Sequence, residues 1–578
     1  AGLYIKIWNY EKAEPLFVEA IDNKKKHINS ALHHLSEREM QQYLLNFESD
    51  LANIASAAHQ MPTTSGMSKL CFDNALFFKG FLLNAYNYYN RAESSDSVFA
   101  EKFQLLKSYG RRLAVEYSKP IAERKRVTEL EEKSNILEKT LAKMNSSYNE
   151  SMKQVNWNEV QKKLKSNEAA IEFIHYPFSN KNSIDSSKSS NQTKLMYAAL
   201  VITPAISQPL FIPLSEEKSI DSLFNRYKDR KSDYVNGLYT LACRGVSPNE
   251  AKNRSLFELI WQPLEKELNG VKTIYYSKTG LLHRINLNAI PISESETLAD
   301  KYQLINLNST RQMVVTNRLK KTNQQALLYG GIQYDLDSLK NNENQKLSKA
   351  KDDISFQLID SKLRGESWDY LAGTEKEVNA IEKIIQQAGI KVALKKGYEA
   401  TEESIKSIGS DNASSPRILH IATHGYFFPD TKKTEQSSGG NRQDEAIFKM
   451  SDHPMLRSGL IMAGGNTAWQ GQQRLEGRED GILTAYEISF MNLANTELVV
   501  LSACETGLGD IQGNEGVYGL QRAFKMAGAK YLIISLWQVP DRQTSILMTL
   551  FYKKWLEEKM SIPDTFHTAQ KELRDKGL

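Results

Sequence analysis

The sequence predicts an α/β fold in which a mostly parallel sheet is flanked by helices. Short apolar runs alternate with helical segments through the second half of the 578 residues, a pattern typical of parallel sheets covered on both faces. Two of these runs stop at small-residue turns that carry His424 and Cys504. The expected strands are Ala326–Ile332, Val392–Leu394, Ile418–Ala422, Leu460–Ala463, Leu498–Ser502 and Tyr531–Leu536.

An earlier α/β block is expected over residues 166–322. Ala169–His175, Met196–Thr203 and Val271–Ser277 have the apolar, β-branched and aromatic composition of strands. Ser179–Lys194, rich in Ser, Asn and Lys, is expected to be a flexible loop between the first two. The sequence therefore predicts two successive α/β blocks, the second over residues 323–578.

Residues 29–165 are predicted to form a helical connector. Glycine is sparse there, and one apolar stripe recurs near heptad spacing at Val127, Leu130, Leu137, Leu141 and Met144. Lys and Arg crowd the other face around Lys119–Lys133. We interpret that face as solvated, with a nucleic-acid-binding face as the alternative.

Residues 1–28 match part of a tetratricopeptide repeat. Ala13, Phe17 and Ala20 have the A-x3-F-x2-A spacing of such a repeat's second helix; an ordinary amphipathic helix is the alternative. Because a single repeat cannot bury its own faces, we expect this to be a truncated repeat. The start at Ala1 without methionine also suggests a fragment of a longer protein.

Composition narrows the classes of function. The chain is 40% hydrophobic and 25% charged, and its net charge of +5 gives no argument for a nucleic-acid or membrane partner. No apolar run approaches the roughly 18 residues of a membrane span. Three cysteines without CxxC spacing indicate a reducing compartment, so we expect a cytoplasmic protein. No cluster has metal-ligand spacing, and no metal or cofactor is expected.

The two strand-end residues form a candidate nucleophile and base. A thiol attacks a carbonyl as thiolate, so Cys504 needs a base, and His424 is the obvious one. The backbone N–H groups of Gly425 and Cys504 are expected to form an oxyanion hole. Small residues before Cys504 and glycines after it argue against the alternative, a buried packing cysteine.

We expect several other residues that could carry chemistry to have structural roles instead. Cys71 and Cys243 are assigned to packing, and His420 to the core, one layer below His424. Thr374–Glu377 reads as a capping box ahead of a buried stripe at Val378, Ile381 and Ile385. The polar stretch Asp430–Asp452 is expected to be a mobile active-site loop.

Several motifs occur together in the second half of the chain. They are HIATHGYF from His420, EDGILTAYEI from Glu479, LVVLSACETG from Leu498, GNEGVYGLQRAF from Gly513 and SLWQVPD from Ser535. Together they resemble the CHAT domain, a caspase-like cysteine protease module associated with tetratricopeptide repeats. The resemblance extends upstream to about residue 165, through SKTGLLHRINLNAI from Ser277 and GTEKEV from Gly373.

The resemblance implies a caspase-like fold with a pseudo-protease half before the catalytic half. It also implies that Cys504 is the nucleophile, that His424 is the general base, and that the reaction is peptide-bond hydrolysis in a bacterial defence or cell-death setting. The chain lacks the Trp-containing final strand that usually follows the helix resembling Phe566–Lys576 in this family. Edge-strand stability and activity are expected to depend on that strand.

Substrate specificity departs from that of caspases. Ser502-Ala-Cys-Glu-Thr-Gly and the 80-residue spacing between histidine and cysteine differ from the caspase signature, so aspartate specificity is not carried over. Asp541 matches the acidic S1 residue of related clan members such as separase. A carboxylate there would select Arg or Lys at P1. A helix N-cap at Asp541 is an equally weighted and compatible alternative.

The expected function is therefore a cysteine endopeptidase that acts on a protein substrate. A protein or ligand activator is expected to act through the helical repeats. One rival is a catalytically silent scaffold, which the intact Cys–His pair argues against; the other is a different thiol hydrolase, such as a transpeptidase.

Overall fold

The computed structural model describes residues 4, 10–61, 66–92, 97–117, 124–144, 154–178, 193–226, 238–239, 255–315, 323–335, 367–410, 413–429, 453–470, 479–504, 506–537 and 539–577. The chain folds into two compact units that interleave along the sequence. The first unit comprises residues 1–88, 135–317 and 511–516, and the second comprises residues 89–134, 318–510 and 517–578. Most of the expected loop Ser179–Lys194, all of the expected loop Asp430–Asp452, and Cys243 lie outside the described residues.

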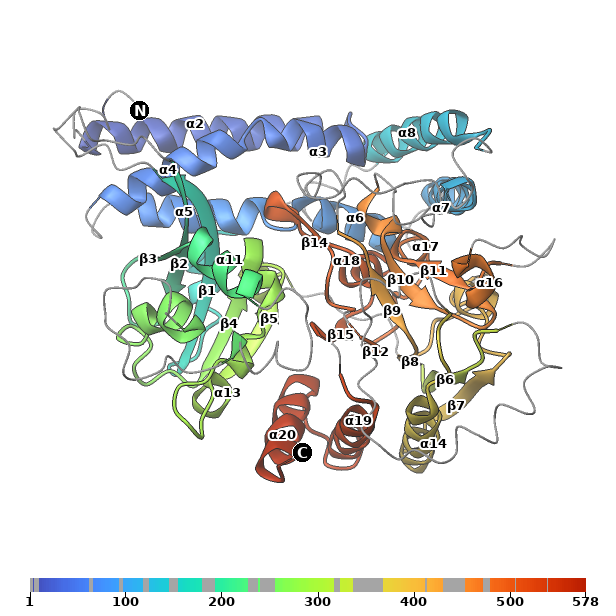
Figure 1. Cartoon of the computed structure of the whole chain (residues 1–578). Coiled ribbons are helices and arrows are strands. Elements are labelled where there is room, and N and C mark those ends of the chain that lie inside the picture. The colour runs from blue at the N-terminus through green and yellow to red at the C-terminus, as the bar shows by residue number, and fades with distance from the viewer. Residues whose placement is uncertain are drawn as a thin grey trace. The chain divides into compact units, whose positions relative to one another are not determined.

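The first unit combines helices with a five-stranded sheet. In the order β3-β2-β1-β4-β5, strands β1, β2 and β3 pair antiparallel, and β1, β4 and β5 pair parallel. One core joins helical residues such as Phe72 and Leu76 to strand residues such as Leu200. The elements are α2 (Tyr10–Ala31), α3 (Glu37–Leu45), α4 (Glu48–Gln60), α5 (Met67–Phe78), α10 (Trp157–Gln161), β1 (Glu168–Phe178), β2 (Lys194–Ile202), β3 (Leu210–Glu216), α11 (Glu217–Arg226), β4 (Thr273–Ser277), α13 (Leu298–Lys301) and β5 (Gln303–Leu307) (Figure 1).

Two long helices continue from one unit into the other, α6 (Phe81–Ala92) and α8 (Val127–Met144). On α8 the expected apolar stripe is buried at Leu130, Leu137 and Leu141. On α2 the expected stripe is only partly correct: Ala13 is buried, but Ala20 is exposed and its neighbour Ile21 is buried instead. The helix is one unbroken run of 22 residues, so its buried face follows the helical period through Ile21 and Ile28.

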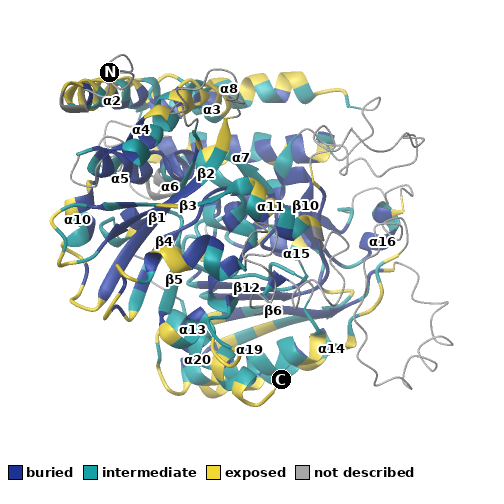
Figure 2. Cartoon of the chain, turned by 60° about the vertical axis from the view of Figure 1, so that its left-hand side comes forward, coloured by how far each residue is buried: buried dark blue, intermediate teal, exposed yellow. Residues whose placement is uncertain are grey.

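The second unit contains the predicted parallel sheet. Its order is β15-β12-β8-β6-β7, and every neighbouring pair is parallel. Figure 2 shows its central strands in the colour of buried residues. The strands are β6 (Gln325–Ile332), β7 (Lys391–Gly397), β8 (Ile418–Ala422), β12 (Leu498–Ser502) and β15 (Tyr531–Ile533). These predicted strands are thus confirmed, except that β7 runs from Lys391 to Gly397 instead of from Val392 to Leu394, and β15 ends three residues early.

A small antiparallel sheet, in the order β11-β10-β9, continues from the histidine strand. The run expected at Leu460–Ala463 belongs to it and starts earlier, at Ser458. Its strands are β9 (Gly425–Phe427), β10 (Ser458–Ile461) and β11 (Ile482–Thr484), and a short hairpin pairs β13 (Asp510–Gln512) with β14 (Gly516–Tyr518).

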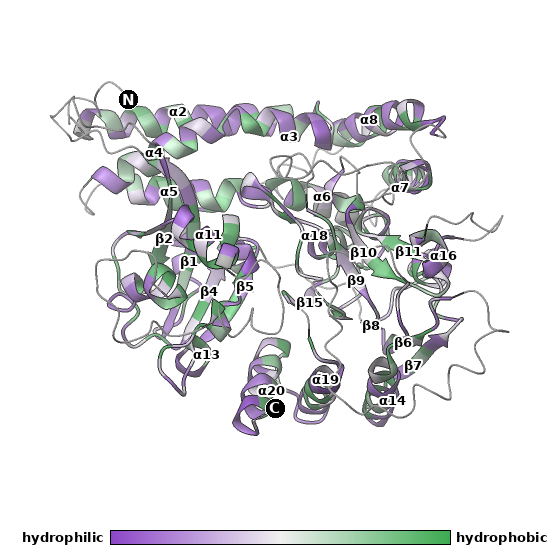
Figure 3. Cartoon of the chain, in the orientation of Figure 1, coloured by the Kyte–Doolittle hydropathy of each residue, from purple (hydrophilic) through white to green (hydrophobic). Residues whose placement is uncertain are grey.

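Helices α14 (Ala372–Gln387), α19 (Asp541–Leu556) and α20 (Ile562–Asp575) lie together on one side of the parallel sheet (Figure 1). Hydrophobic and hydrophilic residues alternate along α14 (Figure 3), and Val378, Ile381 and Ile385 are fully buried, as the sequence predicts. This unit also contains α7 (Ser97–Tyr117), α15 (Glu402–Lys406), α16 (Gly465–Trp469), α17 (Ala485–Ile488) and α18 (Leu520–Met526).

The capping box expected at Thr374–Glu377 is wrong. Helix α14 begins at Ala372, and its N-cap, Leu371, has no side-chain cap. The hydroxyl of Thr374 donates to the carbonyl of Leu371 and accepts from the N–H of Gly331. The start of α14 is therefore tied to the end of β6, and Glu377 is left for another role.

Candidate active site at the ends of two parallel strands

Strands β8 and β12 bring the two predicted residues to the same edge of the sheet. Ala422 pairs with Ser502 in register, and the N–H of Thr423 donates to the carbonyl of Ser502 at 3.3 Å. His424 and Cys504 each follow these paired residues by two positions. Parallel strands that end together place both side chains at the carboxyl edge of the sheet, where open α/β folds form their sites.

Both side chains line one open pocket of about 260 Å³. Asp541, the predicted S1 residue, lines the same pocket, so the structure brings three of the predicted site residues together. The lining residues are Tyr370, Leu371, Ala372, Gly373, Thr374, Glu377, Thr423, His424, Ser502, Ala503, Cys504, Val539, Asp541 and Thr544.

The imidazole of His424 is buried and held in one orientation. Its Nε2 lies 2.9 Å from the carbonyl oxygen of Asp369. The ring centroids of Trp368 and Tyr334 lie 4.7 and 5.1 Å from the centroid of the imidazole. A carbonyl only accepts, so Nε2 carries the proton of the neutral ring and Nδ1 has the lone pair. Burial lowers the pKa of His424 to about 4, which keeps the ring neutral at neutral pH.

One buried amide fixes the segment that covers His424. The Asn466 side chain accepts from the N–H of Trp368 at 2.6 Å and donates to its carbonyl at 3.0 Å. It also donates to the carboxylate of Asp335 at 2.8 Å. Asn466 thus holds the backbone of Trp368, whose ring contacts His424 and which directly precedes Asp369, the carbonyl partner of Nε2. No sequence motif marked this residue.

The turn after β12 is tied to the segment that leads to Asp541. The hydroxyl of Ser535 donates to the carbonyl of Ala503, and the N–H of Ser535 donates to the hydroxyl of Thr506 at 3.1 Å. The N–H of Gly507 donates to the carbonyl of Ser535 at 2.7 Å. These bonds couple the position of Cys504 to that of the SLWQVPD motif.

Gly425 is required by crowding from the cysteine turn. A Cβ atom at this position would stand 2.9 Å from both the carbonyl oxygen of Cys504 and the methyl of Thr506. The glycine therefore lets the two strand ends approach each other. The oxyanion hole formed by the N–H groups of Gly425 and Cys504 stays a prediction.

Asp541 is the first residue of α19, and the N-cap is Pro540, without a side-chain cap. The N-cap alternative for Asp541 is therefore wrong, because the helix begins one residue earlier than that role requires. A Cβ at Gly373 would stand 2.6 Å from the Cβ of Asp541, so the carboxyl side chain packs against the start of α14. Desolvation by the surrounding residues, and then the charge of Glu377, raise the pKa of Asp541.

Glu377 is a site residue that sequence reasoning missed. Its side chain is 2% exposed, and Oε2 accepts from the hydroxyl of Ser502 at 3.1 Å. Its Oε1 lies 3.0 Å from Nε2 of His420, whose Nδ1 lies 3.2 Å from the hydroxyl of Tyr552. His420 is fully buried, as predicted for a core histidine. The only signal in the sequence was the apparent capping box, which gave Glu377 a different role.

Away from this pocket, Cys71 is buried, and desolvation raises the pKa of its thiol. Packing, the role predicted for it, agrees with this setting, because a buried apolar environment disfavours the thiolate. Among the described cysteines, Cys504 is the one that lines the pocket.

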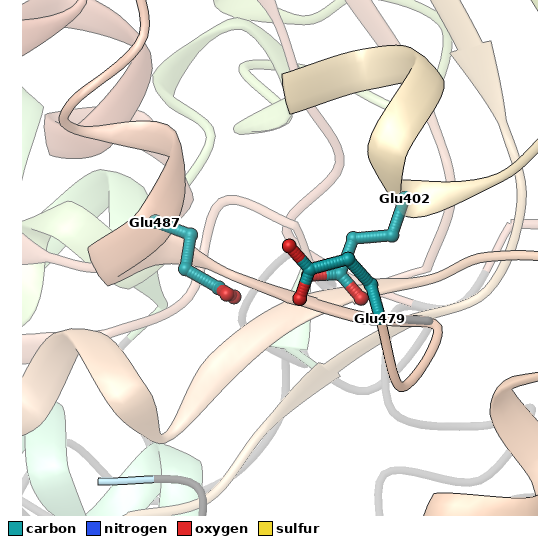
Figure 4. Close-up of side chains that lie close together, drawn as sticks. All are labelled: Glu402, Glu479 and Glu487. Atoms are coloured by element: carbon teal, nitrogen blue, oxygen red, sulfur yellow. The ribbon is translucent and has the colours of Figure 1, made fainter. Parts of the chain in front are cut away.

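Three glutamates from separate segments converge elsewhere in this unit, Glu402, Glu479 and Glu487 (Figure 4). Sequence spacing did not reveal this cluster. The Nζ atom of Lys406 lies 3.2, 2.7 and 3.1 Å from their carboxylates, in that order. The cluster is thus an ion-pair junction around Lys406 that joins α15, the segment before β11 and α17.

Comparison with known proteins agrees with the motifs. The family model of the CHAT domain matches residues 250–577, more than half of the chain. No curated protein matches the chain. Within the described residues, no helix is long and apolar enough to cross a membrane. The match covers the pocket and both strand-end residues, and the chain belongs to the CHAT-domain family.

Proposed function

We propose that this chain is a cysteine endopeptidase that uses Cys504 as nucleophile and His424 as general base. The observation that supports this most is that the two residues end adjacent parallel strands and line one pocket. The bond from Nε2 of His424 to a backbone carbonyl also leaves Nδ1 as the ring's proton acceptor.

The proposed reaction passes through a thioacyl-enzyme. Nδ1 of His424 takes the thiol proton as Sγ of Cys504 attacks the peptide carbonyl carbon. The C–N bond then breaks, and the same proton passes to the leaving amine. A water molecule then attacks the thioester carbonyl and gives a proton to Nδ1, the C–S bond breaks, and the proton on Nδ1 returns to Sγ as the acid product leaves. The carbonyl of Asp369 steadies the transient imidazolium through Nε2.

We propose a basic P1 residue. Asp541 lines the same pocket as the dyad and contributes a carboxylate to it. A carboxylate binds the cation of Arg or Lys through charge-assisted hydrogen bonds. The expected caspase-like architecture of this half is supported by the parallel sheet and the helices that cover it.

We also propose that a protein or ligand partner regulates the activity through the N-terminal helices, as repeat-associated modules would. Helix α2 contains Ala13, Phe17 and Ala20, the residues with the spacing of a tetratricopeptide repeat. A cytoplasmic role in bacterial defence fits the low cysteine content and the family resemblance, and it belongs to this proposal.

Fluorogenic peptides with Arg, Lys or Asp at P1 test the proposal, beside a Cys504→Ala control. We expect cleavage after Arg and Lys that is lost in the control. Cleavage of no peptide, even with candidate activators, would favour the scaffold. Cleavage after Asp alone would contradict the role of Asp541.

A further inference from the structure

We propose that Glu377 is a second specificity residue of this pocket, and that Glu377 and Asp541 together bind the guanidinium of a P1 arginine. The inference rests on the peptidase function proposed above. It adds a second residue, on a different helix from Asp541, that binds the positive charge of the substrate. Glu377 lies on α14, whereas Asp541 starts α19.

The Glu377 carboxylate is held in place by one hydrogen bond, and its second oxygen has no hydrogen-bond donor among the described residues. Ser502, two residues before the nucleophile, donates to Oε2 at 3.1 Å. Oε1 lies 3.0 Å from Nε2 of His420 without forming a hydrogen bond, and no other described residue bonds to it. A buried carboxylate oxygen without a donor is costly. A cationic substrate group that enters the pocket would supply one.

The pocket has an uncompensated negative charge. Its lining residues include two carboxylates, those of Glu377 and Asp541, and no Lys or Arg among the described residues. His424 adds no positive charge, because burial lowers its pKa to about 4. The two carboxylates also repel each other, since the charge of Glu377 raises the pKa of Asp541. A cation between them relieves this repulsion.

The two carboxylates lie at different depths. Asp541 is exposed, whereas the Glu377 side chain is 2% exposed. A long cationic side chain can therefore pass Asp541 and reach Glu377. Arginine fits this arrangement better than lysine, because its planar guanidinium offers five donors that can face two carboxylates.

A structural role for Glu377 is the competing explanation, since it also contacts Ser502 and His420. The decisive comparison is between P1 arginine and P1 citrulline, which has nearly the same shape and no charge. Glu377→Gln retains the size of the side chain and an oxygen for Ser502. Glu382→Gln, on the same helix and outside the pocket lining, is the matched control.

We expect Glu377→Gln to lower kcat/KM for the arginine peptide by about tenfold or more, the size of one charge-assisted bond. The loss should be much smaller for the citrulline peptide, and Glu382→Gln should change the cleavage of neither peptide. In the pH profile of kcat/KM for the arginine peptide, the acid limb should also move to lower pH. The reason is that the charge of Glu377 raises the pKa of Asp541, and the variant removes that charge. The other titratable groups that face Glu377 are His420 and Tyr552. An equal loss on arginine and citrulline would overturn the proposal.

Binding separates this inference from the proposed reaction. Cys504→Ala should bind the arginine peptide more tightly than the citrulline peptide, and adding Glu377→Gln should reduce that difference. If the wild-type protein cleaves nothing but this pattern of binding holds, the peptidase function fails and the pocket assignment stands. If the arginine and citrulline peptides bind Cys504→Ala equally, the pocket assignment fails.

Discussion

His424 shows how the environment of one residue sets its chemistry. The rings of Trp368 and Tyr334 flank it, a backbone carbonyl accepts from Nε2, and burial lowers its pKa to about 4. A neutral imidazole with Nδ1 unprotonated is the form a general base requires. The sequence predicted this histidine and its strand, but the covering segment starts 56 residues earlier in the chain, and only the fold brings it there.

The lowered pKa of His424 gives a stability prediction. In the unfolded chain this imidazole titrates near 6.5, and in the folded protein near 4. Because the folded-state pKa is depressed, the stability that depends on neutral His424 is present above about pH 6.5 and is lost as pH falls towards 4. The loss is on the order of 3 kcal/mol.

Urea unfolding of the wild-type protein and His424→Gln, measured between pH 7 and 4, tests this. The variant should lose less stability over that range. Identical pH dependence of the two proteins would show that His424 is not a source of the acid sensitivity.

Asn466 is predicted to position the base. Asn466→Ala removes three side-chain bonds, two to the backbone of Trp368 and one to Asp335. Peptidase kcat should fall roughly 10- to 100-fold, the scale of a small misplacement of a catalytic group, with little change in KM. Asn379→Ala, which removes a contact to Lys396 outside the pocket, is the control. Unchanged kcat in Asn466→Ala would refute the positioning role.

At the scale of elements, the sheet was predictable and the helix contacts were not. The alternation of apolar runs with helical segments predicted β6, β8 and β12 because parallel strands buried on both faces are continuously apolar. Glu377 was assigned to a cap because local spacing cannot show that α14 brings this side chain to Ser502 of β12 and His420 of β8. The glutamate cluster was missed for the same reason, because Glu402, Glu479 and Glu487 come from three separate segments of the chain.

The lysine at the centre of that cluster is predicted to be essential for stability. Lys406 is 12% exposed and contacts all three carboxylates. Lys406→Met leaves buried negative charges unpaired and should cost about 3–5 kcal/mol of unfolding free energy. Glu402→Gln should be much milder, because it removes one excess negative charge and desolvation already raises the pKa of Glu402.

Thermal unfolding of the two variants measures this difference. A Glu402→Gln variant as unstable as Lys406→Met would show that the junction depends on each ion pair separately.

At the scale of the whole molecule, composition predicted helices first and α/β blocks after them, but not the interleaving of two compact units. In the first unit, helical residues and strands share one core. Lys79, at the end of α5, pairs with the fully buried Glu172 of β1 at 2.8 Å and donates to the carbonyl of Ser277 on β4. The order of elements in a sequence does not reveal such a contact between residues almost 100 positions apart.

The pair of Lys79 and Glu172 yields a prediction about how this unit is held together. Lys79→Met should destabilise it by about 3–5 kcal/mol, because Glu172 is left buried without its cation. The double variant Lys79→Met/Glu172→Gln should recover part of the loss. Urea unfolding of Lys79→Met, Glu172→Gln and the double variant measures this coupling. A loss of stability in the double variant equal to the sum of the two single losses would contradict it.

The most direct test of the account is covalent labelling at the pocket. A peptidyl acyloxymethyl ketone with arginine at P1 should add once, on Cys504, as mapped by mass spectrometry. The label should be lost in His424→Ala, slowed in Asp541→Asn, and much slower for the aspartate analogue. Labelling that survives Cys504→Ala, or that falls equally on Cys71, would contradict the assignment of Cys504 and His424 as nucleophile and base.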